Sequence, residues 1–334
     1  MALGVDGVRI GTWTAPDGVS GCTVVLPPPG TVGAIAVRGA APGTREAAAL
    51  GPAGKVTVCN AVVLSGGSAY GLASADGVMR WLEERDTGYR LRNGVVVPIV
   101  GAAIVLDESV MVREARPGPD AGYAACEAAT AADPPEGGVG VGAGCTVAKV
   151  GGLDRAWRSG QGIAVRSAAG VTVGAIVANN AVGEVVGDDG RWIARARIPD
   201  DAPRWPADGR ALGAPDDEPP GGDGTPGIGG PSGNTVLGCI VTDARLTKRD
   251  VHRVADLGHS GLARALRPAH TESDGDALFC LATGQVETTV DLVAHLAAEA
   301  VADAVRRGPL AATGRRGLPG LADAGGGAEG RLLR

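Results

Sequence analysis

The sequence predicts a mixed α/β (α+β) fold, because strand-like and helix-like segments alternate along the chain. Short runs rich in Val and Ile, separated by Gly-rich turns and Ala-rich stretches, fill residues 1–198. An alternating strand pattern returns at Thr235 and is followed by further helix-like and strand-like segments. Apolar residues make up 44% of the 334 positions, which is enough to form a hydrophobic core.

The first part of the chain contains several regular elements with turn signals between them. Short Val- and Ile-rich runs predict buried strands, and Ala-rich stretches predict helices. In chain order the predictions are a strand at 62–64, a Gly-rich turn at 65–68, a helix at 69–85, one or two buried strands at 95–106, a helix at 122–132 and a strand at 171–178.

The composition changes between Ile198 and Gly233, where Pro, Gly and Asp are frequent and almost nothing can be buried. We therefore expect residues 199–233 to form an exposed, flexible linker. After it, the predicted elements are a strand from Thr235, a helix at 247–266 that opens with a capping-box-like Thr247 and Asp250, a strand at 276–282 and an amphipathic helix at 290–306. The Gly- and Ala-rich residues 309–334 are expected to fray.

Charge and composition exclude several classes of protein. A net charge of −6 without a basic stretch argues against nucleic-acid binding. The longest apolar run, residues 95–106, is too short to span a bilayer. Six cysteines without a CxxC pair, an N-terminus without a signal-peptide pattern and four scattered histidines predict a cytoplasmic protein that needs no metal or cofactor.

The junction Gly233-Asn234-Thr235 has two interpretations. Locally, it is most simply a turn that enters a strand. Alternatively it is a self-cleaving junction, in which the Thr235 hydroxyl attacks the preceding carbonyl and water opens the resulting ester. Cleavage would free Thr235 as a new N-terminus, with its hydroxyl as nucleophile and its own α-amine as base. An α-amine has an ordinary pKa of about 7.7–8.0, which suits a base near neutral pH.

Two acidic residues, Asp274 and Asp276, precede the predicted strand at 276–282. On their own they are typical of a solvated loop. They are also suited to hold a catalytic amine or hydroxyl through charge-assisted hydrogen bonds. A metal site is the weakest interpretation, because the loop lacks further oxygen ligands of a calcium site.

The turn Gly66-Gly67-Ser68 joins a predicted strand to a predicted helix. It lacks the GxSxG pattern of a serine nucleophile elbow. Its backbone amides are candidates for binding an oxyanion or a substrate, and close packing of strand on helix is the alternative. Asn180, at the end of another predicted strand, is either a turn residue or an amide donor to an oxyanion.

Gly138 to Gly144 superficially suggests a dinucleotide-binding loop, but no acidic residue ends a second strand at the right distance. A structural loop is the favoured interpretation. Lys149, five residues further on, is an ordinary surface lysine when it is taken alone.

Taken together and in this order, these motifs resemble the self-processing family that includes L-aminopeptidase D-amidase/D-esterase (DmpA), the β-peptidyl aminopeptidases and the nylon-oligomer endo-hydrolase (NylC). The similarity covers most of the chain. Its matching stretches are residues 37–39 through 44–46, 62–72, 97–100, 138–144, 174–183, 233–237 and 270–284.

This resemblance implies a four-layer α/β/β/α sandwich of the N-terminal nucleophile hydrolase type. It implies cleavage between Asn234 and Thr235 into chains 1–234 and 235–334, which stay associated and assemble as a homotetramer. Thr235 would be the nucleophile, and Asn180 would help to hold the oxyanion or the free amine. The resemblance further implies that Asp274 and Asp276 orient the new N-terminus and that Lys149 is the active-site lysine.

The expected function is therefore hydrolysis of amide or ester bonds in small peptides or amino-acid oligomers through a threonine acyl-enzyme. Two alternatives remain at this stage. One is a serine esterase that uses Ser68 with His270 or His259. The other is a non-catalytic ligand-binding protein in which the Gly-rich loops only pack.

Overall fold

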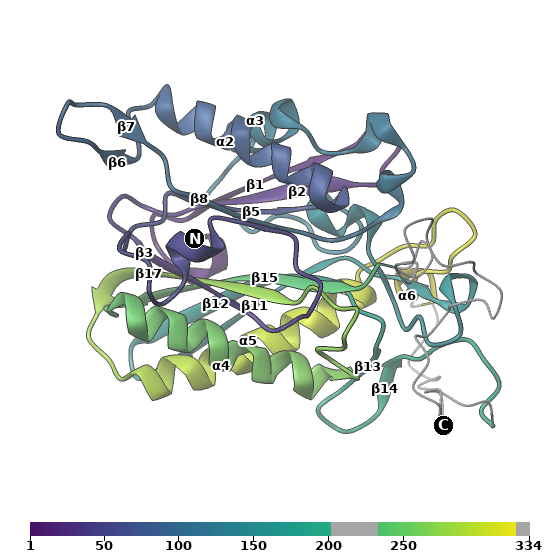
Figure 1. Cartoon of the computed structure of the whole chain (residues 1–334). Coiled ribbons are helices and arrows are strands. Elements are labelled where there is room, and N and C mark those ends of the chain that lie inside the picture. Colours follow the sequence, from purple (N-terminus) through teal and green to yellow (C-terminus); the bar gives the residue numbers. More distant parts are fainter. Residues whose placement is uncertain (202–232, 325–334) are drawn as a thin grey trace.

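Two five-stranded sheets form the centre of the computed structural model, which describes residues 1–201 and 233–324 (Figure 1). One sheet has the order β1 (Arg9–Thr14), β2 (Gly21–Leu26), β5 (Ala61–Ser65), β8 (Val100–Ile104) and β4 (Thr44–Arg45). The other has the order β11 (Gln161–Ala168), β12 (Val171–Asn180), β15 (Thr235–Ala244), β17 (Ala277–Val286) and β3 (Val32–Val37). Neighbouring strands are antiparallel except in the pairs β5–β8 and β15–β17.

The remaining elements are the helices and three small sheets. The α-helices are α1 (Ala47–Leu50), α2 (Ser74–Glu83), α3 (Pro119–Glu127), α4 (Lys248–Ala265), α5 (Val290–Leu310) and α6 (Leu321–Ala324). Short 3₁₀ helices cover Ala2–Gly4, Ser68–Ala73, Glu108–Val110, Arg113–Ala115, Gly140–Gly144 and Leu153–Arg155. The small sheets pair β6 (Tyr89–Arg90) with β7 (Val96–Val97), β9 (Thr146–Val147) with β10 (Trp157–Arg158), and β13 (Glu184–Val186) with β14 (Trp192–Ala194) and β16 (Leu266–Arg267).

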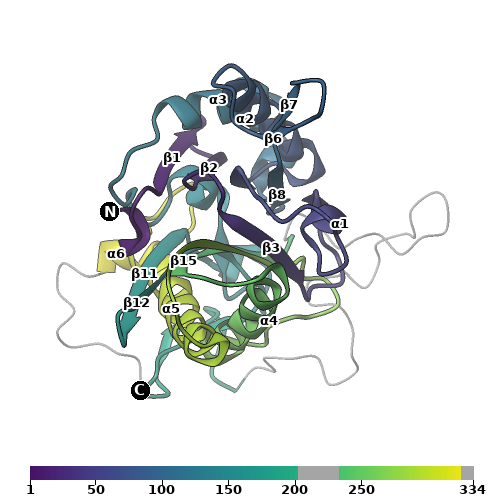
Figure 2. The ribbon, with the colours of Figure 1, turned by 90° about the vertical axis from the view of Figure 1, so that its left-hand side faces the viewer.

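The two large sheets face one another and each carries a pair of helices on its outer side (Figures 1 and 2). Helices α2 and α3 pack on the first sheet, and α4 and α5 pack on the second. A third apolar cluster, which includes Val62, Ile176, Leu237 and Phe279, fills the space between the sheets. This arrangement is an α/β/β/α sandwich, so the predicted fold class is confirmed.

Small residues let the layers approach closely. The chain has a single Phe, Phe279, and most of its core is built from Ala, Val, Leu and Ile. In α4, a Cβ added at Gly261 would lie 2.3 Å from the carbonyl oxygen of Ala298 in α5, so only glycine permits this contact between the helices. A tightly packed interior of this kind holds strand ends in fixed positions.

Most of the predicted strands and helices are present. The apolar run 95–106 forms two strands, β7 and β8, on either side of Pro98. The capping box of α4 is confirmed, because the Thr247 side chain accepts a hydrogen bond from the Asp250 N–H and the Asp250 side chain accepts one from Thr247.

Two predicted helices differ from those observed. The helix expected at 69–85 is a 3₁₀ helix followed by α2, because the turn before it places Gly67 and Ser68 at φ 84° and 54°. The helix expected at 122–132 is α3, which begins earlier, at Pro119. It ends before Thr130, whose carbonyl accepts a hydrogen bond from the Ile10 N–H beside β1.

The predicted fraying of residues 309–334 is wrong for the part that the structure describes. Ala312 is buried, the Pro319 carbonyl accepts a hydrogen bond from the Arg158 N–H, and α6 follows. The rest of that prediction, residues 325–334, and most of the predicted linker, residues 202–232, lie outside the described residues.

Candidate active site

Thr235 is the first residue of β15, the central strand of the second sheet. It lies opposite Asn180, the last residue of β12, and its exposed fraction is 4%. The neighbouring strand on the other side, β17, begins directly after the acidic pair Asp274 and Asp276. The sheet therefore brings three segments that are far apart in the sequence to one end of its central strands.

The Thr235 hydroxyl lies against the carbonyl that precedes it. Its Oγ1 donates a hydrogen bond to the Asn234 oxygen. The same oxygen accepts a hydrogen bond of 3.1 Å from the Gly275 N–H. Asn234 and Asp274 also form an isolated parallel bridge, which aligns the two chain segments. A side-chain hydroxyl and an amide donor therefore meet at one carbonyl group, an arrangement suited to attack on that carbonyl.

Asp276 is almost fully buried and joins strand β15 to the His270 loop. Its Oδ1 accepts the Val236 N–H at 2.7 Å. Its Oδ2 accepts the His270 N–H at 3.2 Å and lies 2.7 Å from His270 Nδ1. Asp276 therefore fixes the backbone directly after Thr235.

Asp274 is also buried, with an exposed fraction of 2%. Its Oδ2 accepts hydrogen bonds from the N–H and the hydroxyl of Thr271, at 2.8 and 2.6 Å. Its Oδ1 has no hydrogen-bond partner among the residues that the structure describes. Burial, followed by the negative charge of Asp276, raises the pKa of Asp274. A buried acceptor without a donor is unfavourable, and a new donor at this place would remove the cost.

Lys149 is buried, contrary to its interpretation as a surface lysine. Its Nζ donates to the Gly233 carbonyl at 2.8 Å and to the main-chain and side-chain oxygens of Asn180 at 3.0 and 3.1 Å. Burial lowers the pKa of Lys149 from its ordinary value of 10.5 to about 7. With this pKa, the Lys149 side chain exchanges between its ammonium and neutral amine forms near neutral pH.

The Asn180 side chain is held from both ends. Its Oδ1 accepts the Thr146 N–H at 2.9 Å as well as the lysine. Its Nδ2 donates to the carbonyl oxygens of Leu106 at 3.0 Å and Gly233 at 2.9 Å. Two side-chain donors, one from Asn180 and one from Lys149, thus converge on the Gly233 carbonyl.

The Gly66-Gly67-Ser68 turn does not offer free amide groups. The N–H of Gly66 donates to the Gly21 carbonyl, that of Gly67 to Asp107 Oδ1 and that of Ser68 to the Val105 carbonyl, at 2.9, 3.1 and 3.0 Å. Each predicted oxyanion donor in this turn is already used by the fold. In the uncut chain these amides are therefore not free to donate to an oxyanion.

The structure also gives no support to a serine esterase. His270 Nδ1 is paired with Asp276, and His259 Nε2 lies 3.1 Å from the Ala36 carbonyl oxygen. Within residues 1–201 and 233–324, no hydrogen bond joins Ser68 to either histidine. The histidines belong to the surroundings of the acidic pair.

Sequence reasoning missed three residues at the site. Gly275 stands between the two aspartates, and its N–H rather than its side chain is used. Asp107 is buried and accepts hydrogen bonds from Ser20, Ser109 and Gly67. Leu106 contributes its carbonyl to Asn180. Only Asp107 left a signal, as a lone carboxyl directly after an apolar run.

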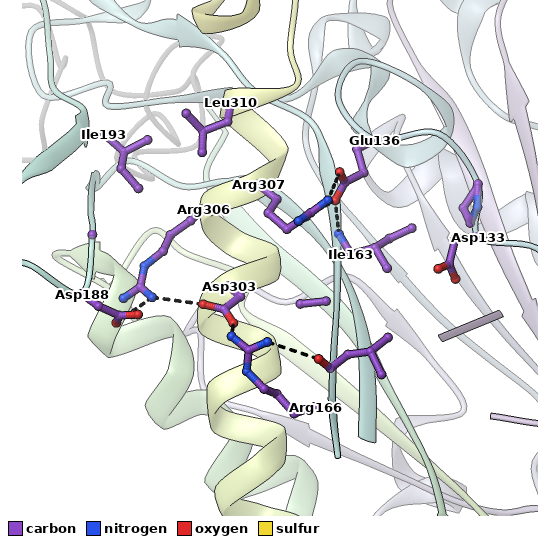
Figure 3. Close-up of a pocket in the computed structure, with 14 residues that line it drawn as sticks. Asp133, Glu136, Ile163, Arg166, Asp188, Ile193, Asp303, Arg306, Arg307 and Leu310 are labelled. Atoms are coloured by element: carbon purple, nitrogen blue, oxygen red, sulfur yellow. Dashed lines mark hydrogen bonds and ion pairs between the residues drawn. The ribbon is translucent and has the colours of Figure 1, made fainter. Parts of the chain in front are cut away.

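A separate cavity of about 700 Å³ lies between β11, α5 and the β13–β14 region (Figure 3). No sequence-predicted site residue lines it. The three arginines of its wall are paired with carboxylates, Arg307 with Glu136, Arg306 with Asp188 and Asp303, and Arg166 with Asp303. The positive charges of its wall are therefore compensated.

Solved structures define the class to which this fold belongs. The structure of this chain matches that of the β-aminopeptidase of Burkholderia sp. with a TM-score of 0.71 and 21% identity, over 99% of this chain and 91% of that chain. It matches an L-aminopeptidase D-Ala-esterase/amidase from Ochrobactrum anthropi, a variant of the Ntn hydrolase fold, with a TM-score of 0.67 and 17% identity, over 95% and 88% of the two chains. The fold is that of an N-terminal nucleophile (Ntn) hydrolase.

The sequence comparisons place the chain within this class. The model of Peptidase family S58 matches residues 3–321, and the chain belongs to that family. It is 43% identical over 351 residues to an uncharacterised aminopeptidase of Mycobacterium tuberculosis (strain ATCC 25618 / H37Rv), with 96% of each chain covered. It is 31% identical over 286 residues to a 6-aminohexanoate-oligomer endohydrolase of Agromyces sp. (strain KY5R), over 84% of this chain and 74% of the endohydrolase. The chain is a hydrolase of peptide or amide bonds.

Proposed function

We propose that this chain is a self-cleaving amidohydrolase, which cuts itself between Asn234 and Thr235 and then uses Thr235 as its N-terminal nucleophile. The observation that carries the proposal is the contact of the Thr235 hydroxyl with the Asn234 carbonyl, whose oxygen also accepts the Gly275 N–H. The relatives named as an aminopeptidase and an oligomer endohydrolase support the reaction class.

Self-cleavage takes place in two steps. Thr235 Oγ1 forms a bond to the Asn234 carbonyl carbon, and the Gly275 N–H stabilises the developing negative charge on the oxygen. The bond from that carbon to the Thr235 nitrogen breaks, and the proton lost by the hydroxyl ends on the departing amine. Water then hydrolyses the ester, which leaves a carboxylate on Asn234 and restores the hydroxyl.

Turnover of a substrate repeats this chemistry with the free amine as the general base. The unpartnered Oδ1 of Asp274 is the acceptor that would hold the new amine. Asp276 would keep the strand in place through the Val236 N–H. Asn180 and Lys149, released from the Gly233 carbonyl, would donate to the substrate. An amine held beside a carboxylate and a lysine is oriented before it reacts.

The substrates are small peptides, amides or esters, or amino-acid oligomers. The two cut chains stay together because β15 is hydrogen-bonded to β12 on one side and to β17 on the other. A homotetramer and a cytoplasmic location remain our proposals. Among the described helices, none is both long and apolar enough to cross a bilayer.

Intact-mass measurement of the purified protein tests the proposal. We expect two chains, residues 1–234 and 235–334, with Thr235 as the first residue of the smaller one. Thr235→Ala should remain one inactive chain of 334 residues, whereas Thr235→Ser should retain some cleavage, because a hydroxyl remains. A Thr235→Ala protein that still splits, or labelling of Ser68 by a fluorophosphonate in an uncut active protein, would refute it.

A further inference from the structure

We infer that the active site prefers substrates whose scissile residue carries an acyl group on its nitrogen, and that Leu106 restricts this acyl group to one without a branch next to its carbonyl. The site would thus act on blocked or internal amide bonds in preference to free amino ends. This inference rests on the proposed function, and it names the substrate class for the same site.

The chemical basis is that self-cleavage and substrate turnover share one kind of intermediate. When Thr235 Oγ1 attacks the Asn234 carbonyl, the ester that forms is an acyl-enzyme whose acyl group ends in Gly233-Asn234. A substrate amide forms the same ester when its own carbonyl is attacked. The contacts that hold Gly233 and Asn234 in the uncut chain therefore indicate what the acyl side of the site recognises.

The first contact concerns the carbonyl that precedes the scissile residue. The Gly233 oxygen accepts hydrogen bonds from Lys149 Nζ at 2.8 Å and from Asn180 Nδ2 at 2.9 Å. Both donors belong to residues that are at least 98% buried. An N-acylated residue places a carbonyl oxygen between them. A free amine leaves both donors without this acceptor, which is costly in a buried site.

The second contact is steric. A Cβ built on Gly233 would lie 2.2 Å from Leu106 Cβ, 2.6 Å from Cγ and 2.5 Å from Cδ2. The nearest of these atoms is fixed directly to the backbone, so the Leu106 side chain cannot rotate away from it. The Leu106 carbonyl is in turn held by Asn180 Nδ2 at 3.0 Å. The wall is therefore anchored, and it excludes a branched carbon at this position.

The surroundings also disfavour a free amino end on the substrate. Asp276 already accepts the Val236 N–H and lies against His270. The unpartnered Oδ1 of Asp274 is the acceptor proposed for the Thr235 amine. The group that faces the preceding carbonyl is Lys149, which in its protonated form would repel an ammonium group. A substrate ammonium would thus meet a cation instead of a free carboxylate.

Self-cleavage tests the steric part, because the chain is then its own substrate. In cell-free synthesis, Gly233→Ala should split at least about tenfold more slowly than the wild type. The double variant with Leu106→Gly should recover most of the lost rate. Gly138→Ala is the matched control, because a Cβ there meets nothing within 4 Å. An unchanged rate in Gly233→Ala, or no recovery in the double variant, would overturn the steric part.

Fully cleaved wild-type protein tests the substrate class. We expect kcat/KM for acetyl-Gly-Asn-p-nitroanilide to exceed that for Asn-p-nitroanilide and that for acetyl-Ala-Asn-p-nitroanilide, each by at least about tenfold. Faster turnover of the free amine, equal turnover of the Gly and Ala compounds, or no turnover of any of the three would overturn the inference. These outcomes differ from the one that would refute the proposed function, which is that the Thr235→Ala protein is still split.

Discussion

The Gly275 N–H donates a hydrogen bond of 3.1 Å to the Asn234 carbonyl oxygen. This oxygen also accepts a hydrogen bond from the Thr235 hydroxyl, so a backbone donor and a side-chain hydroxyl contact the same carbonyl group. The donor lies in the loop between Asp274 and Asp276. One short loop therefore supplies both the carboxylates of the site and the amide that would stabilise an oxyanion. A substitution that moves the backbone of this loop should therefore affect self-cleavage.

Substitution of Gly275 by Ala should slow self-cleavage by roughly 10²-fold. The new Cβ would lie 2.9 Å from Thr235 Oγ1 and 2.7 Å from the Ala41 carbonyl oxygen, so the hydroxyl or the loop must move. The rate is measured as the appearance of the two chains on a denaturing gel after cell-free synthesis. Gly138→Ala should split at the wild-type rate, and equal rates in both variants would contradict the role assigned to Gly275.

Substitution of Asp274 by Asn should stabilise the uncut chain and impair turnover. Burial and Asp276 raise the pKa of Asp274, so ionisation of its carboxyl opposes folding, and this cost grows as the pH rises through the acidic range. In the Thr235→Ala background, Asp274→Asn should therefore increase the free energy of unfolding more at pH 8 than at pH 4. Urea denaturation at both pH values measures the difference. A larger gain at pH 4 would contradict this explanation.

Lys149 should make stability depend on pH above neutrality. Its pKa falls from 10.5 to about 7 on burial, so below pH 7 both the folded and the unfolded state hold the proton and the full cost of burial is present. The cost declines as the pH rises from 7 towards 10.5, because only the unfolded state then binds the proton. Between pH 7 and pH 9, the free energy of unfolding of Thr235→Ala should rise by on the order of 1–3 kcal/mol more than that of the double variant Thr235→Ala/Lys149→Met. Equal slopes in urea denaturation would refute the assignment.

Asp107 should matter for both stability and activity, although it makes no contact with Thr235. It accepts hydrogen bonds from Ser20, Ser109 and Gly67, and its neighbour Leu106 holds Asn180. Asp107→Asn should lower the free energy of unfolding by about 1–3 kcal/mol, because donors would face an amide NH₂ group. Asp120→Asn is the control, since the Asp120 side chain is 98% exposed. Equal stabilities of the two variants would be the contrary result.

The sequence was most informative where long apolar runs coincide with central strands. β12 and β15 are nearly continuous apolar segments, and such segments are readily recognised. The hairpin of β1 and β2 was missed: β1 is an edge strand with only partial burial, and the apolar run of β2 is short. The 3₁₀ turn before α2 depends on positive φ angles at Gly67 and Ser68, which local propensity does not reveal.

The candidate site could be predicted only as a set of residues, not as an arrangement. The family resemblance assembled Thr235, Asn180, Lys149 and the two aspartates, and the structure brings these together around one strand end. The roles of Gly275 and Leu106 could not be predicted, because they are exerted by backbone groups and close packing. The amides of Gly66 and Gly67, predicted as candidate oxyanion donors, are satisfied in the uncut chain by acceptors distant in sequence, which local sequence does not reveal.

The strand order of the second sheet has a consequence for reversibility. β15 and β17 lie between β12 and β3. If the chain is cut before Thr235, the two central strands belong to the second piece, and the strands on both sides of them belong to the first. The uncut polypeptide folds as one molecule. Once it is cut and denatured, recovery of the sheet requires two separate molecules to meet, so it becomes concentration-dependent and loses the advantage of a covalent tether. The mature protein would then be protected by slow unfolding more than by its ability to refold.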